Sequence, residues 1–84
     1  MSFKYEWKKQ PTKFVKSQTR EQQTRIMAAV GKLPWAGDIR QIEGRKGVYG
    51  LRVGCYRVVY SVDKDRLLIT VIEADVRGQV YKNL

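Results

Sequence analysis

The chain has 84 residues, of which 17 are basic and 8 are acidic, and its formal net charge is +9. This length fits a single small domain over residues 1–84, and the charge favours a polyanionic partner, either nucleic acid or an acidic protein. The absence of histidine and the single cysteine exclude a zinc site and an internal disulfide framework. No apolar run is long enough to span a membrane, and no signal-peptide pattern is present, so we expect no membrane partner and a cytoplasmic protein.

The first part of the chain predicts one strand followed by two helices. Apolar and charged residues alternate over residues 3–7, which is typical of a short strand with one apolar face. Pro11 suits the first turn of a short helix. Thr19 begins a capping-box pattern that places the start of a second helix near Arg20. The apolar stripe of this second helix is expected to consist of Ile26, Met27, Val30 and Leu33.

Residues 34–47 show little periodicity and predict a connecting loop. Arg45 and Lys46 lie in this segment between Gly44 and Gly47, and glycines allow a backbone to approach a ligand closely. A solvated turn would have the same composition, so both interpretations stay open. The first of them makes Arg45 and Lys46 candidate RNA-binding residues.

Residues 48–60 predict a β-hairpin that turns at Gly54 and Cys55, because two alternating runs of β-branched and aromatic residues flank this pair. With a two-residue loop, Arg52 faces Arg57 across the two strands. Like charges directly opposite each other destabilise a sheet, so the pair predicts an anion bound between them. Pairing of each arginine with a carboxylate is the alternative. The opposite face of the hairpin would carry Leu51, Val53, Tyr56 and Val58.

The remaining segments complete an α+β fold. Residues 63–66 predict a polar turn, and residues 67–72 are apolar on both faces, as in a central strand. The pattern is lost from residue 73 onward. The predicted order is β-α-α-β-β-β, with two N-terminal helices packed on one face of a small, mostly antiparallel, four-stranded sheet. The other face, with Arg52 and Arg57, would be open.

Four segments of the second half resemble, in order, the RelE/ParE superfamily of bacterial and archaeal toxins, and most closely the RelE-type messenger-RNA interferases. The segments are residues 37–39, residues 42–49, Leu51-Arg-Val-Gly-Cys-Tyr-Arg-Val-Val-Tyr60 and Arg77-Gly-Gln-Val-Tyr81. The resemblance implies a RelE/ParE-like fold. It also implies a toxin that cuts messenger RNA in the ribosomal A site without a metal or other cofactor.

The family's working residues are basic side chains on the two middle strands and an arginine and a tyrosine near the C-terminus. The resemblance therefore implies that Arg52, Arg57, Arg77 and Tyr81 are catalytic. Guanidinium groups would hold the phosphate, and Tyr81 would exchange a proton with the RNA 2′-hydroxyl. A salt bridge for Arg77 and a packing role for Tyr81 are the structural alternatives.

The chain departs from the family pattern at three positions. Gly50 stands where a second basic residue often precedes Arg52, Cys55 replaces an aspartate of the turn, and Val76 replaces a frequent histidine. The departure at Gly50 removes a cation from the predicted site. The question is then whether Arg45 or Lys46 can reach the site and replace it.

Three functions follow from these observations. The favoured one is a ribosome-dependent endoribonuclease, the toxin of a type II toxin–antitoxin system, with the ribosome, messenger RNA and an acidic antitoxin as partners. The toxin would be a monomer within its toxin–antitoxin complex. The alternatives are a ParE-like inhibitor of DNA gyrase that cuts no RNA and a non-toxic basic binding module.

Overall fold

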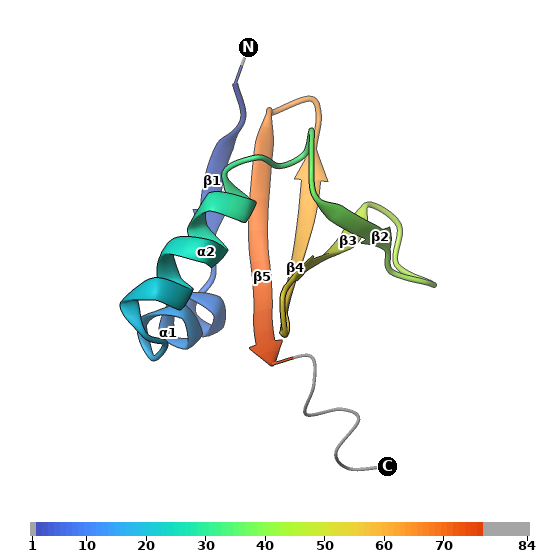
Figure 1. The fold of residues 1–84 in the computed structure, drawn as a ribbon. Coiled ribbons are helices and arrows are strands. Elements are labelled where there is room, and N and C mark those ends of the chain that lie inside the picture. Colours follow the sequence, from blue (N-terminus) through green and yellow to red (C-terminus); the bar gives the residue numbers. More distant parts are fainter. Residues whose placement is uncertain (1, 77–84) are drawn as a thin grey trace.

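The computed structural model describes residues 2–76, which form two helices and a five-stranded sheet (Figure 1). The strand order is β1-β5-β4-β3-β2, in which β1 runs parallel to β5 and the other neighbours are antiparallel. Both helices lie on one side of the sheet, so the predicted α+β class is confirmed. The elements are β1 (Lys4–Trp7), α1 (Lys9–Lys16), α2 (Arg20–Val30), β2 (Asp38–Gln41), β3 (Val48–Val53), β4 (Tyr56–Asp63) and β5 (Leu68–Val76).

The predicted number of four strands was wrong, because Asp38–Gln41 forms the edge strand β2 instead of part of a loop. This strand has four residues with one apolar side chain, which is too short for a detectable alternation. Pairing with β3 therefore defines it. Gly37 precedes β2 with a φ of 129°, and a Cβ atom there would lie 2.8 Å from Leu51 Cδ1. A glycine thus allows the chain to pass close to β3.

The second helix begins where the sequence predicts, and it ends at Val30, so that Leu33 of the predicted stripe lies beyond the helix. The Thr19 side chain accepts a hydrogen bond from the backbone N–H of Gln22, and Gly31 follows the last helical residue. The prediction for Met27 was wrong, because 48% of this residue is exposed. Met27 follows Ile26 directly and is rotated about 100° around the helix axis from it, away from the sheet. The residues of the predicted stripe that are buried are Ile26, Val30 and Leu33.

One glutamine side chain of the first helix forms hydrogen bonds with the sheet. The Gln10 Nε2 atom donates to the Ala74 carbonyl at 2.8 Å, and the Ala74 N–H donates to Gln10 Oε1 at 2.9 Å. Strand β1 pairs with β5 only as far as Val71. The amide of Gln10 therefore satisfies backbone groups of β5 that β1 leaves unpaired, which would be costly if they were buried without partners.

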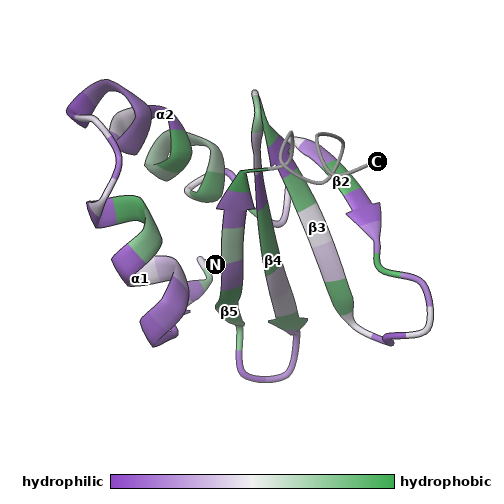
Figure 2. Cartoon of the chain, turned by 90° about the horizontal axis from the view of Figure 1, so that it is seen from below, coloured by the Kyte–Doolittle hydropathy of each residue, from purple (hydrophilic) through white to green (hydrophobic). Residues whose placement is uncertain are grey.

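The predicted hairpin is confirmed in its register. Val53 pairs with Tyr56, Arg52 pairs with Arg57, and Gly54 has the positive φ of 59° that a tight turn requires. The strands β3, β4 and β5 contain most of the hydrophobic segments of the sheet, whereas β2 is largely hydrophilic (Figure 2). The buried core consists of Val15, Ile26, Val30, Leu33, Leu51, Val53, Tyr56, Val58, Tyr60, Ile69, Val71 and Ala74.

Strand β5 extends to Val76, four residues beyond the predicted end at Ile72. The alternation becomes hard to detect there because a bulge lies in the pairing with β4, between Val59 and Tyr60. The polar turn before β5 is confirmed, since the Asp63 side chain accepts from two backbone N–H groups of this turn. In the described part of the chain, no helix has the length and apolar character needed to cross a bilayer.

Tyr60 makes the stability of the fold depend on pH in the alkaline range. Burial, together with the neighbouring Tyr49, raises the pKa of Tyr60 from 10.0 to about 12. The unfolded chain loses this proton at lower pH than the folded chain, so the stabilisation is lost as the pH rises from about 10 to about 12. Over this range the free energy of unfolding should fall by about 2–3 kcal/mol more in the parent chain than in Tyr60→Phe. Urea unfolding at a series of pH values measures this difference, and equal slopes in both proteins would contradict it.

Candidate nucleic-acid interface

The open face of the sheet carries a row of four charged residues across four neighbouring strands. The strand registers place Asp38 beside Arg52, Arg52 beside Arg57, and Arg57 beside Asp75. Directly paired residues point to the same face of a sheet. The row is therefore negative, positive, positive, negative from β2 to β5, and its two arginines lie in the middle.

Each arginine of this row forms an ion pair with the carboxylate on its outer side. Arg57 Nη2 lies 3.1 Å from Asp75 Oδ2, and Arg52 Nε lies 3.5 Å from Asp38 Oδ2. All four side chains are about half-exposed or slightly less, so each pair contributes little to stability. The two aspartates balance the charge of the like-charged pair. The alternative of internal carboxylate partners is thus observed in the structure.

Both arginines keep hydrogen-bonding capacity for a ligand. A guanidinium has five N–H donors, and the hydrogen bond from Arg57 Nη2 to Asp75 uses one of them. The Nε atoms of Arg52 and Arg57 are buried without a hydrogen-bond partner among the described residues. Because these Nε atoms are buried while the two side chains are partly exposed, a ligand would meet the arginines at the Nη ends of their guanidinium groups. An oxyanion such as a phosphate diester could bind there.

A second row runs parallel to the first, one alternation further along the strands. It consists of Arg40 on β2, Gly50 on β3, Val59 on β4 and Glu73 on β5. Arg40 is exposed and forms no ion pair with a described residue. Arg40 was not predicted to belong to the site, because residues 34–47 were expected to form a loop. The four residues of this strand are too few to give an alternation that could have identified it.

The structure does not place Arg45 and Lys46 beside the arginine pair. Both are exposed in the loop between β2 and β3. This loop precedes Val48 at one end of β3, whereas Arg52 lies near the other end, about 13 Å further along the strand. Their role in RNA binding stays a prediction. Arg77 and Tyr81, the other two predicted catalytic residues, lie outside the described residues.

No protein-family profile matches the chain, and no curated protein matches it. Solved structures do. The RelE chain of an archaeal RelE–RelB complex from Pyrococcus horikoshii OT3 is 25% identical, with a TM-score of 0.79, over 94% of this chain and 99% of that chain. A RelB–RelE antitoxin–toxin complex from Methanococcus jannaschii contains a chain that is 24% identical, with a TM-score of 0.72, over 94% of this chain and 98% of that chain. The isolated E. coli RelE toxin is 16% identical, with a TM-score of 0.76, over 98% of this chain and 94% of that chain.

By fold, the chain belongs to the RelE superfamily. The superfamily predicted from the sequence is thus confirmed. The alignments with the three RelE structures cover nearly the whole length of each matched chain. The row of charges from Asp38 to Asp75 therefore lies on the open face of a RelE-type sheet.

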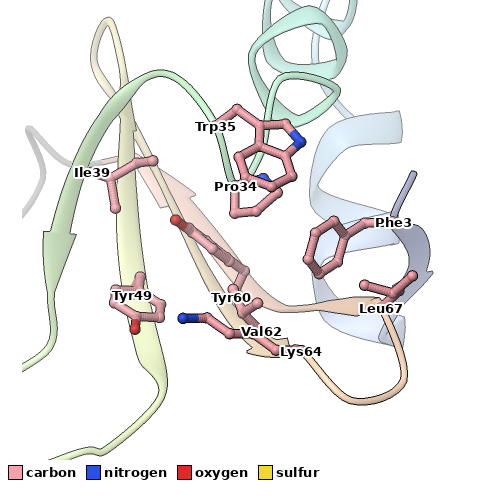
Figure 3. Close-up of a pocket in the computed structure, with 9 residues that line it drawn as sticks. All are labelled: Phe3, Pro34, Trp35, Ile39, Tyr49, Tyr60, Val62, Lys64 and Leu67. Atoms are coloured by element: carbon pink, nitrogen blue, oxygen red, sulfur yellow. The ribbon is translucent and has the colours of Figure 1, made fainter. Parts of the chain in front are cut away.

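The RelE-like chain also has an apolar groove on the helix side of its sheet (Figure 3). The groove has a volume of about 570 Å³, and Phe3, Trp35, Tyr49 and Tyr60 are among its lining residues. Trp35 is 77% exposed, and its ring meets that of Phe3 edge-on, with centroids 5.8 Å apart. Lys64 extends across the groove toward Tyr49. Exposed apolar surface of this kind is typical of protein–protein contact sites.

Proposed function

We propose that the chain is the toxin of a type II toxin–antitoxin system and that it cuts messenger RNA on the ribosome. The observation that carries the proposal is the Arg52–Arg57 pair in the centre of the open face of a RelE-type sheet. The net charge of +9 supports a polyanionic target. Two of the similar structures are complexes of RelE with RelB, which supports an antitoxin partner for this chain.

The proposed cleavage uses the 2′-hydroxyl of the RNA as the nucleophile. This oxygen attacks the adjacent phosphorus and its proton passes to a base. The bond from phosphorus to the 5′-oxygen of the next nucleotide breaks, this oxygen takes up a proton from an acid or from water, and a 2′,3′-cyclic phosphate remains. Arg52 and Arg57 would bind the non-bridging oxygens and stabilise the charge that develops on them. Asp38 and Asp75 would position the two guanidinium groups from the outside. Because the arginines supply the positive charge, the proposal requires no metal.

In this proposal, residues of the C-terminal segment carry out the proton transfer. Tyr81 would act as the base, and Arg77 would bind a phosphate oxygen or favour the ionised form of the tyrosine. Because the ordinary pKa of a tyrosine is about 10, only a small fraction of such side chains is ionised near neutral pH. The isolated protein should therefore cut RNA slowly. Dependence on the ribosome for positioning of the message is consistent with this chemistry.

The proposed antitoxin is an acidic protein that binds one copy of the toxin. An acidic chain complements the charge of +9, and complementary charge speeds association and favours the correct partner. The apolar groove beside Trp35 offers the buried contact that such a complex needs in addition to charge. Since the proposed target is the translating ribosome, the proposed location of the toxin is the cytoplasm.

Primer extension on messenger RNA tests the proposal directly. Brief induction of the parent chain, without an antitoxin, should produce cuts in phase with the codons of translated messages. Cells treated to stop initiation of translation should show no such cuts, because the message is then free of ribosomes. Arrested growth with intact messages would contradict RNA cleavage, and a DNA-damage response in those cells would select gyrase as the target. Normal growth would select a non-toxic binding module.

A further inference from the structure

Arg40 lies next to the pair formed by Arg52 and Arg57 and has no role in the cleavage site proposed above. It pairs directly with Gly50, and Gly50 is two residues from Arg52 on the same strand. Arg40 and Arg52 are therefore diagonal neighbours on one face of the sheet, and the usual backbone spacing of such neighbours is roughly 7–8 Å. Gly50 has no side chain, so β3 itself supplies no charge at this row, and a cation there has to come from β2.

The charge balance of the two rows makes Arg40 different from the central arginines. Arg52 and Arg57 each have an aspartate within 4 Å, whereas Arg40 has no carboxylate at ion-pair distance among the described residues. The other end of its row carries Glu73, two strands away from Gly50. Arg40 is also exposed on the edge strand of the sheet. It is thus the cation of the two rows that an approaching anion can meet without competition from a neighbouring carboxylate.

We propose that Arg40 binds a second phosphate of the RNA, next along the strand to the one held between Arg52 and Arg57. This inference rests on the proposed function, because it extends the same phosphate site by one nucleotide. A long guanidinium side chain can span the diagonal between β2 and β3, so two neighbouring phosphates can be bound at the same time. Arg40 would hold the strand in register while the central pair acts on the scissile phosphate.

Binding of a short single-stranded RNA with 2′-O-methyl riboses tests this role without cleavage. Fluorescence anisotropy over a range of salt concentrations gives the affinity and its salt dependence. Arg40→Ala should weaken binding roughly tenfold at low salt. It should also reduce the slope of log K against log salt by about 0.7, the value for one phosphate contact on a single strand. Arg40→Lys should keep the slope, because the charge remains.

Two further variants separate a specific contact from a general loss of charge. Arg20→Ala, on the exposed surface of α2, removes the same charge from the helix side and should leave the slope nearly unchanged. The double variant Arg40→Ala with Gly50→Lys returns a cation to the same row and should recover most of the binding. The geometry allows this, because a Cβ atom at Gly50 would lie 3.6 Å from Ile42 Cδ1, an ordinary contact.

The outcomes for Arg40 and for the proposed function are distinguishable. If Arg40→Ala and Arg20→Ala bind alike while Arg52→Ala binds much more weakly, the inference about Arg40 is overturned and the proposed site stands. If neither Arg52→Ala nor Arg57→Ala changes RNA binding or cleavage in translating ribosomes, the proposed function itself is wrong. Recovery of binding when Gly50→Lys is added to Arg40→Ala supports the second phosphate subsite.

Discussion

The Arg57→Ala variant is expected to cut ribosome-bound message roughly 100- to 1,000-fold more slowly than the parent chain. Removal of one donor that stabilises developing charge on an oxyanion has an effect of this size. Arg57 is the side chain placed for that role, because it lies beside Arg52 in the middle of the charged row. Quantified primer extension in a purified translation system measures the rate of cutting at a single codon.

Loss of the fold cannot account for this result if the variant is stable. The ion pair between Arg57 and Asp75 is only partly buried, so its loss should lower the free energy of unfolding by no more than about 1 kcal/mol. Thermal unfolding of the variant checks this point. Arg66→Ala is the matched control, since it removes the same charge from the exposed turn before β5. Equal cutting by the parent chain and Arg57→Ala would exclude Arg57 from the reaction.

The Ile26→Ala variant is expected to lose about 2–5 kcal/mol of stability, a large fraction of the total for a domain of this size. Ile26 is fully buried, at 0% exposure, where α2 packs on the sheet. Its truncation leaves a cavity at the contact that holds the helix in place, and a helix of this length is not stable alone. Urea unfolding followed by circular dichroism measures the change.

The neighbouring methionine provides the control for this prediction. Met27 is half-exposed on the same helix, so Met27→Ala should change the free energy of unfolding by less than about 0.5 kcal/mol. The two variants remove side chains of similar size from adjacent positions. A loss of equal size in both would contradict the prediction that burial against the sheet determines the effect, since alanine has the highest helix propensity and cannot itself weaken the helix.

For the facing arginines, the sequence predicted the register of the two strands but not the groups that balance their charge. Alternation and the glycine turn were sufficient to predict that Arg52 and Arg57 lie opposite each other, and the structure has this register. The prediction of an anion between them assumed that nothing else balanced their charge. Asp38 and Asp75 do so in the folded chain. Pairing with carboxylates was the predicted alternative, but Asp38 and Asp75 could not be identified as the partners, because both belong to strands whose extents the sequence did not predict.

The sequence by itself determined those elements that have a clear alternation of apolar residues or a clear capping or turn residue at one end. The capped helix that starts after Thr19, the hairpin around Gly54 and the turn at Asp63 all follow from hydrogen bonds and backbone angles within a few residues. Such short-range interactions are the same in any surroundings. The resemblance to RelE toxins followed from segments in the second half of the chain, and the comparisons of structure confirmed the superfamily.

Long-range pairing determined the features on which the candidate site depends. Strand β2 exists because it pairs with β3, and β5 continues to Val76 because it pairs with β4 beyond the bulge. These two pairings place Asp38, Arg40 and Asp75 around the arginines. Neither strand end carries a repeat of its own, since its residues are stabilised by hydrogen bonds to a distant part of the chain. The charged surface of this protein is therefore a property of the assembled sheet, while the hairpin at its centre is a property of its own sequence.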